Sequence, residues 1–229
     1  MSKGALTDLG ALGYLHFLPN GVDTKNYIPE KREVIPYETW EQKQREFENN
    51  VSFVPHLGLR ASSLRNYGIG FNRDGQYFTF PMYNEQGRIC GMSTRFKDGS
   101  KACVKGSAIG VFLPRKKHNQ DVWCAVEGAS DAATIWELGF NAIGRYNCDT
   151  PVGTIYNIVG TKIKAKAIVV VADQNEVGIN GAKKLAYKLS DKIRTVVMYM
   201  PPGIKDIREF YNKGLTREKF SYAIRQLGV

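Results

Sequence analysis

The sequence predicts an α/β protein: a mostly parallel sheet flanked by helices, preceded by a smaller, mainly β subdomain. From residue 122 onward, short apolar runs alternate with helical patterns, which is typical of strand–helix–strand units. Between residues 76 and 112, β-rich runs follow one another with only turn signals between them. With 229 residues, 43% of them hydrophobic, the chain can form a sizeable core, which excludes a disordered tail or a disulfide mini-protein.

The first predicted elements are helices. The stretch up to Pro36 mixes Gly, Pro and Asn with short apolar pieces and is predicted to be loosely structured. Residues 39–50 predict a polar helix, in which Trp40 and Phe47 form a narrow apolar stripe. Residues 62–67 predict a second short helix, capped by Ser at its start and ended by Gly68.

An antiparallel meander is predicted next. The runs Tyr77–Phe80 and Arg88–Met92 are rich in β-forming residues, and the turn-forming stretch Asn84–Gly87 lies between them. Lys97–Gly99 marks a further turn. These runs together predict a small sheet of antiparallel strands.

The alternating part begins at Val122. The run 167–172 is almost entirely apolar and β-branched, as expected of a strand that helices cover on both faces. The patterns predict strands at 122–126, 141–144, 167–172 and 195–199, and helices at 130–138, at 178–189 and from about 217.

Charge divides the chain unevenly. The net charge is +10, and residues 60–117 alone carry eleven basic and three acidic side chains, a net +8. A polyanion or an anionic surface is the expected partner. A solvated charged face is the alternative, but aromatic side chains interleave the charges, which favours nucleic acid. The predicted domains are residues 1–57, 58–117 and 118–229, with residues 115–118 as an exposed linker.

Acidic side chains follow two of the predicted parallel strands. Glu127 and Asp131 flank a turn at Gly128, and Asp173 and Asn175 follow the next apolar strand. Ligands collect beyond the carboxyl ends of such strands, and oxygen ligands suit Mg²⁺ or Mn²⁺. Each motif alone is equally consistent with a helix cap or a turn, whereas both together favour a metal site.

A third acid, Asp206, follows the strand predicted at 195–199. Its position is as consistent with a helix N-cap as with a metal ligand.

The cysteines and the apolar segments limit other functions. Cys90, Cys103, Cys124 and Cys148 are widely spaced, so a zinc site is not expected and reduced thiols in a cytoplasmic protein are. No apolar stretch is long enough to cross a membrane, and no membrane role is expected.

Three motifs resemble the signatures of TOPRIM domains in DnaG-type primases and related phage or plasmid primases. They are VEGASD at 126–131, ADQNEVG at 172–178 and GIKD at 203–206. The stretch from Phe80 to Arg95 is similar to a further primase motif, and the resemblance covers about residues 58–212. Asn175 stands where the family usually has Asp. The zinc-binding module that usually precedes such primases has no counterpart here.

The resemblance implies a TOPRIM sheet and a primase site. Catalytic residues would be Glu127, Asp131 and Asp173. Metal ligands would be Glu127, Asp173, Asn175 and Asp206, holding Mg²⁺ or Mn²⁺. Basic residues that would bind nucleic acid or nucleotide are Arg88, Arg95, Lys101 and Lys105.

The implied activity is DNA-templated synthesis of short RNA primers. Single-stranded DNA and nucleoside triphosphates would be its partners, a replicative helicase could be another, and a phage or plasmid replicon would be its source. The alternatives are a TOPRIM nuclease and a catalytically weakened module that binds single-stranded DNA.

Overall fold

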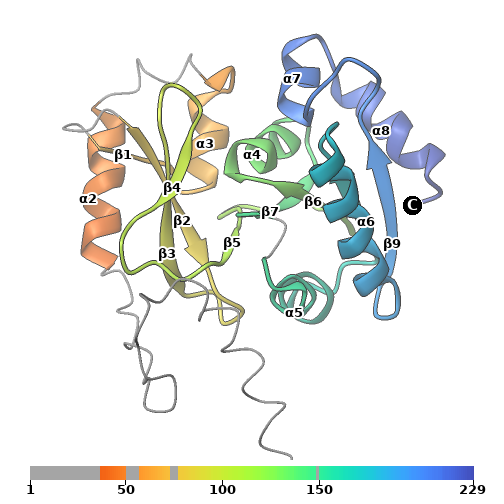
Figure 1. The fold of residues 1–229 in the computed structure, drawn as a ribbon, viewed down its shortest axis with the longest axis horizontal. Helices are drawn as coiled ribbons and strands as arrows, with labels where there is room; N and C mark the ends of the chain where they lie inside the picture. Colours follow the sequence, from red (N-terminus) through yellow and green to blue (C-terminus); the bar gives the residue numbers. More distant parts are fainter. Residues whose placement is uncertain (1–36, 50–56, 73–76, 148–149) are drawn as a thin grey trace, which may run out of the picture. The chain divides into compact units, whose positions relative to one another are not determined.

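One nine-stranded mixed sheet runs through the part of the chain that the structure describes (Figure 1). The computed structural model describes residues 37–49, 57–72, 77–147 and 150–229, all within one unit of residues 33–229. Strand order is β4-β3-β2-β5-β7-β6-β8-β9, and β1 pairs with β2. The segment up to Pro36 that was predicted to be loosely structured lies outside the described residues.

The parallel half of the sheet confirms the predicted α/β class. Its strands, in spatial order, are β7 (Asn141–Arg145), β6 (Val122–Glu127), β8 (Ala167–Ala172) and β9 (Arg194–Tyr199). The connecting helices are α4 (Ala129–Glu137), α5 (Val152–Ile155) with the π-helix η2 (Tyr156–Lys162), and α6 (Glu176–Ser190). The sequence predicted β7, β8 and α6 closely, but showed the α5–η2 segment only as an irregular or helical connection.

Helices cover both faces of this half. On one face, α4, α7 (Ile207–Asn212) and α8 (Arg217–Gln226) pack onto Val126, Val169 and Val171. On the other face, α5, η2 and α6 pack onto Ala125, Ile168 and Val170. Every residue of β8 is buried, as its apolar sequence predicts.

The antiparallel half contains the predicted meander. Strand β2 (Tyr77–Tyr83) pairs with β3 (Ile89–Arg95), and β3 pairs with β4 (Lys101–Cys103). The short strands β1 (Gly70–Asn72) and β5 (Val111–Phe112) were not predicted, because two or three residues give no periodic signal. Strand β5 joins the halves, since it pairs with β2 on one side and with β7 on the other.

The two N-terminal helices pack on the antiparallel half. Helix α2 (Tyr37–Glu48) buries Trp40 and Phe47, as the seven-residue spacing predicts. Helix α3 (Ala61–Asn66) ends before Gly68, whose φ of +67° favours glycine. The predicted Ser cap is wrong: Arg60 is the N-cap residue and makes no side-chain cap bond.

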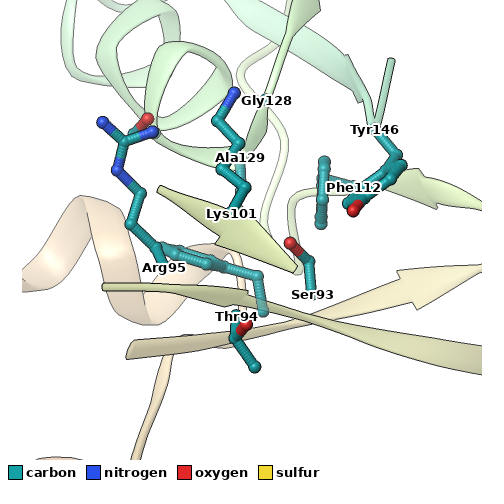
Figure 2. Close-up of a pocket in the computed structure, with 10 residues that line it drawn as sticks. Ser93, Thr94, Arg95, Lys101, Phe112, Gly128, Ala129 and Tyr146 are labelled. Atoms are coloured by element: carbon teal, nitrogen blue, oxygen red, sulfur yellow. The ribbon is translucent and has the colours of Figure 1, made fainter. Parts of the chain in front are cut away.

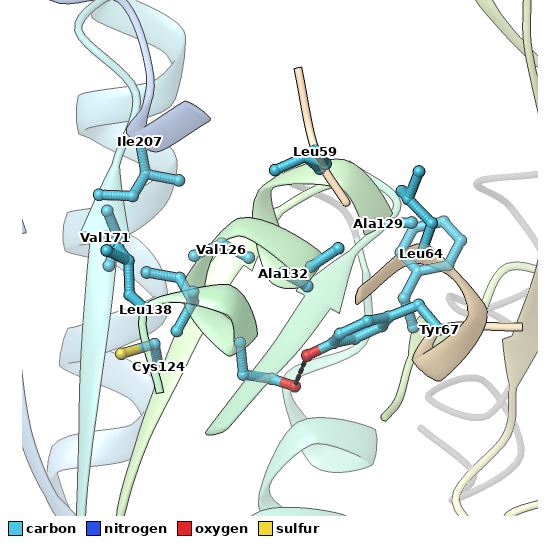
Figure 3. Packing of buried hydrophobic residues seen from close by; sticks show 14 of the residues in the cluster. Leu59, Leu64, Tyr67, Cys124, Val126, Ala129, Ala132, Leu138, Val171 and Ile207 are labelled. Atoms are coloured by element: carbon cyan, nitrogen blue, oxygen red, sulfur yellow. Dashed lines mark hydrogen bonds between the residues drawn. The ribbon is translucent and has the colours of Figure 1, made fainter. Parts of the chain in front are cut away.

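The two halves share one core. Leu64 and Tyr67, in and just after α3, lie against Ala129 and Ala132 of α4 (Figure 3). The Tyr67 hydroxyl donates a hydrogen bond to the carbonyl oxygen of Ala142 in β7, at 2.9 Å. The antiparallel half is therefore fixed against the parallel half by packing as well as by β5.

The segment 115–118 connects the halves, and its basic side chains at 115–117 are exposed, as predicted. Its backbone, however, is held firmly. The Asn66 side chain accepts from the Lys116 N–H at 2.7 Å and donates to the Lys116 carbonyl at 3.0 Å. The Asn141 side chain bonds His118 in the same two ways. The division of the chain at residues 57 and 117 stays a prediction.

A buried carboxylate links α3, α4 and α7. The Glu137 side chain is 1% exposed and accepts from the Arg60 backbone N–H and guanidinium, the Ser63 hydroxyl and the Tyr211 hydroxyl. Because Ser63 belongs to α3 and Tyr211 to α7, hydrogen bonds to Glu137 connect these two helices through α4.

Replacing Glu137 by Ala is expected to lower the free energy of unfolding by about 2 kcal/mol, because four donors from three residues lose their acceptor. Urea denaturation would measure this. The matched control is Glu48→Ala, which removes an exposed pair with Arg65 and should cost less than about 1 kcal/mol. Equal losses in the two variants would contradict the role assigned to Glu137.

No helix among the described residues is both long enough and apolar enough to cross a membrane.

Candidate active site

Acidic residues gather at the carboxyl edge of the parallel strands. Glu127 is the last residue of β6, Asp131 lies in the first turn of α4, and Asp173 directly follows β8. Gly128 makes the sharp bend between β6 and α4 with a φ of +95°, a conformation that side chains other than glycine rarely adopt. Asp206 precedes α7, which packs against α4.

Asp131 is the most buried of these acids. Its residue is 6% exposed, and its Oδ1 has no hydrogen-bond partner. Burial, together with the negative charges of Asp206 and Asp173, raises the pKa of Asp131 to about 7, although Arg208 and Lys101 oppose the shift. A buried carboxylate oxygen without a donor is a place where a cation would be stabilised.

Asp173 is half-buried and shares this electrostatic environment. Burial and the charges of Glu127 and Asp206 raise its pKa to about 6, against the opposing effect of Lys101 and Lys205. The structure therefore brings four acids from three separate parts of the sequence within electrostatic reach of one another. They are Glu127, Asp131, Asp173 and Asp206.

Asn175 and Asp206 both serve as helix caps. The Oδ1 of Asn175 accepts from the Gly178 N–H at 2.8 Å at the start of α6, and Asn175 is exposed. The Oδ1 of Asp206 accepts from the Glu209 N–H at 2.8 Å at the start of α7, and Asp206 is 7% exposed. Both residues therefore have the capping role that the sequence left open. At Asp206 the cap bond occupies one of the two carboxylate oxygens.

Two basic side chains extend from the antiparallel half toward the acids. Arg95 and Lys101 are directly opposite each other on β3 and β4. Figure 2 shows both side chains reaching toward the bend at Gly128. The Nζ of Lys101 and the Oδ2 of Asp131 both lie 3.4 Å from the point that a Cβ on Gly128 would occupy. Lys101 thus crosses from one half of the sheet to the acids of the other.

Arg95 lies between a pocket and a larger groove. The pocket lies beside Gly128 and is lined by Phe80, Ser93, Thr94, Arg95, Lys101, Phe112, Gly128, Ala129, Ser130 and Tyr146 (Figure 2). The groove has a volume of about 420 Å³. Its basic lining residues are Arg95, Lys97, Lys205, Arg208 and Lys213, and its acidic ones are Asp206 and Glu209.

The groove contains basic residues that the sequence did not single out. These are Lys205, Arg208 and Lys213, which lie in α7 or directly beside it. Their position in or just after the GIKD motif is the one feature of the sequence that could have pointed to them. Burial and repulsion by Arg208 lower the pKa of the Arg95 guanidinium, while Asp131 and Asp206 raise it. The groove is therefore a positively charged surface that borders the acids.

The other two basic candidates lie elsewhere. Arg88 is exposed in the turn between β2 and β3, at the opposite end of β3 from Arg95. Lys105 is exposed in the turn after β4. The structure does not bring Arg88 or Lys105 to the acidic edge.

The donor set fits an oxygen-preferring divalent cation. Asp131 offers a buried oxygen without a partner, and its neighbours are carboxylates, which Mg²⁺ and Mn²⁺ prefer. In the present arrangement, no three His, Cys, Asp or Glu side chains of the described residues stand close enough together to hold a metal ion. The carboxylates would have to approach one another to form a complete site. Cys148, one of the four cysteines considered for zinc, lies outside the described residues.

A parallel sheet with acids at its carboxyl edge, extended by an antiparallel meander with a basic groove, defines a TOPRIM-like α/β fold. Residues 124–211 match a family model described as Toprim-like. This segment runs from β6 into α7 and includes all four acids of the site. A search of curated proteins found no match.

Solved primase structures share the fold. A DnaG primase catalytic domain bound to single-stranded DNA aligns with a TM-score of 0.63 and 14% identity, over 82% of this chain and 76% of that one. A DNA primase domain from Pseudomonas aeruginosa gives 0.64 and 15%, over 83% and 77%. The primase fragment of the bacteriophage T7 primase-helicase protein gives 0.57 and 16%, over 73% and 70%. The described chain therefore has the fold of primase catalytic cores.

Proposed function

We propose that this protein synthesises short RNA primers on single-stranded DNA by metal-dependent nucleotidyl transfer. The observation that carries the proposal is the buried Asp131 carboxylate. It has an oxygen without a hydrogen-bond partner, and it lies within electrostatic reach of the acids Asp206 and Asp173 and of the basic Lys101 and Arg208. A site that holds both a divalent cation and phosphate needs this combination of charges. The likeness to a DnaG domain bound to single-stranded DNA supports DNA as the template.

The residues divide into two groups. Glu127 and Asp173 would hold the cation together with Asp206 and Asn175, and Asp131 would add a buried negative charge. When bound, the cation would neutralise triphosphate charge and lower the pKa of the primer 3′-hydroxyl. Arg95 and Lys101 would contact phosphate oxygens, since they reach the acidic edge from the antiparallel half. The groove beyond Arg95 would take the template, whose backbone its basic lining attracts.

A binding module without catalytic activity is the second candidate. Asn175 is neutral, exposed and engaged as a helix cap, so this chain has one carboxylate fewer than the usual TOPRIM signature. Incubation with single-stranded DNA, labelled nucleoside triphosphates and Mg²⁺ or Mn²⁺ separates the possibilities. New oligoribonucleotides support a primase, shortened DNA indicates a nuclease, and retention of intact DNA without product indicates a binding module.

The proposal extends to the setting of the protein. It implies a phage or plasmid replicon that replicates in the cytoplasm or nucleoid of a bacterial host. The fold it shares with the primase fragment of a primase-helicase protein supports a helicase as a further partner.

Metal binding is expected to strengthen as the pH rises toward 7. Folding raises the pKa of Asp131 from 3.8 to about 7 and that of Asp173 to about 6, so near pH 5 both carboxyls bind a proton and compete with the metal. The same shifts should make the metal-free protein less stable as the pH rises from about 4 to 7, because the folded state binds more protons than the unfolded state.

Electron paramagnetic resonance of Mn²⁺ at about pH 5.5 and 7.5 would measure the pH effect on affinity. The wild-type affinity should rise with pH, and Asp131→Asn should reduce the rise because it removes one titrating group. The same affinity at both pH values would contradict the assigned environment.

Asn175→Asp is expected to raise nucleotide transfer with Mg²⁺ while leaving α6 intact. Asp caps helices as well as Asn does, so the bond to the Gly178 N–H should persist. The added charge should strengthen binding of the hard Mg²⁺ ion, whereas the wild-type protein should prefer Mn²⁺. Primer yield with each metal is the measurement. An unchanged or lower yield with Mg²⁺ would mean that Asn175 is only a cap.

A further inference from the structure

Arg145 is a buried cation that forms no hydrogen bond or ion pair with another side chain among the residues that the structure describes. Its residue is 2% exposed, and its Nε has no hydrogen-bond partner. None of the ion pairs found among the described residues involves it. Arginine keeps its proton under all ordinary conditions, so the charge cannot be removed by titration. A buried charge of this kind is costly unless an anion is available to it.

Strand geometry places one carboxylate beside Arg145. Arg145 is the last residue of β7 and lies directly opposite Glu127, the last residue of the neighbouring β6. Parallel strands lie about 4.8 Å apart, which a guanidinium easily spans. The Gly128 N–H donates to the Arg145 carbonyl at 2.7 Å, which fixes the two strands to each other at this point.

The alternation of side chains puts both residues on the same face. A Cβ on Gly144 would meet Phe112, in the core under α4, so the next residue, Arg145, points to the opposite face. Trp123 and Ala125 of β6 pack into the core under α5 and α6, and Glu127 follows them with the same period of two. Asp131 and Asp206 come from helices on the other face.

Packing alone does not account for an arginine here. Val111, which also lies opposite Arg145, and Ile143, two residues earlier on β7, are both fully buried and apolar. An aliphatic side chain would fill the same space without desolvating a charge. The residue is therefore best explained by an anion that can reach it. The strand register makes Glu127 the candidate, although the two side chains form no ion pair among those found in the described residues.

We propose that Arg145 is a positioning residue that supplies the counter-charge for Glu127 and limits the orientations of its carboxylate at the edge of the sheet. This inference rests on the proposed function in one respect, namely that Glu127 is a metal ligand. It adds a basic residue behind the acids, on the opposite side of the sheet from Arg95 and Lys101. No pattern in the sequence indicated this role, because Arg145 follows a strand that was predicted to end at Gly144.

A double-mutant cycle on the metal-free protein tests the coupling. The free energy of unfolding in urea would be measured for wild type, Arg145→Met, Glu127→Gln and the double variant. The effect of Arg145→Met on the unfolding equilibrium constant is expected to differ by about tenfold or more between the wild-type and the Glu127→Gln backgrounds. Arg145→Lys, which keeps the charge, should restore most of the coupling. The control cycle pairs Arg145→Met with Asp131→Asn, where additive effects are expected.

Mn²⁺ affinity is the second readout, because a purely structural role would not change it in a folded variant. Arg145→Met should weaken Mn²⁺ binding by about tenfold, and Arg145→Lys by less. Additive unfolding energies for Arg145 and Glu127 would overturn the proposal. Absence of Mn²⁺ binding in the wild type would instead count against the proposed function, and the unfolding cycle would still decide whether the two residues are coupled.

Discussion

Glu127→Gln is expected to leave the fold intact and to lower nucleotide transfer by a factor on the order of 10² or more. Glu127 ends β6 at the carboxyl edge of the sheet and is half-buried, and its charge contributes to the raised pKa of Asp173. Gln has the same shape but lacks the charge that a divalent cation requires. The loss of rate should therefore appear in a variant that still folds, beyond the change in stability expected from its pairing with Arg145.

Primer yield per folded molecule is the measurement, with circular dichroism to confirm the fold. Glu176→Gln is the matched control, since Glu176 is an exposed acid in the first turn of α6 and close in sequence to Asp173. It should retain nearly full activity. Wild-type yield from a folded Glu127→Gln protein would remove Glu127 from the site.

The second large effect is expected in DNA binding. Changing Arg95, Lys101 and Arg208 to Ala together should weaken binding of single-stranded DNA by about tenfold or more at low salt. All three basic side chains lie at the acidic edge or in the groove beside it. The plot of log affinity against log salt should become shallower by about 0.7 for each phosphate that the variant no longer neutralises.

The control changes the same number of charges on α6. Lys183, Lys184 and Lys188 are exposed on the outer side of that helix, where they are expected mainly to be solvated. Their replacement by Ala should reduce affinity much less. Fluorescence anisotropy of a labelled oligonucleotide across a salt series, without metal, would measure both variants. Loss of binding in the α6 variant alone would place the DNA on the other side of the protein.

The sequence predicts the sheet well where its patterns are strong. The apolar run at 167–172 and the alternation after Val122 specify the parallel strands, because burial on two faces leaves a continuous apolar signal. Turn residues such as Asn84–Gly87 identify the meander. The acids at the ends of β6 and β8 could be chosen before the structure because strand direction alone brings them to one edge.

Other features depend on tertiary contacts that have no local pattern. Arg88 and Arg95 look equivalent in the sequence, yet they lie at opposite ends of β3. Glu137 and Arg145 resemble ordinary surface residues at the ends of their elements, and only packing shows that both are buried. The groove residues of α7 reach the site because that helix packs on α4, a contact between segments about 70 residues apart.

Synthesis on a homopolymer template shows whether this protein makes RNA under the direction of DNA. Labelled ATP would be incubated with oligo(dT), and separately with oligo(dA), in the presence of Mn²⁺. We expect alkali-labile oligoadenylate on oligo(dT) only, in the wild-type protein and not in Glu127→Gln. Product that forms equally on both templates, or bound DNA without any oligoadenylate, would contradict template-directed primer synthesis.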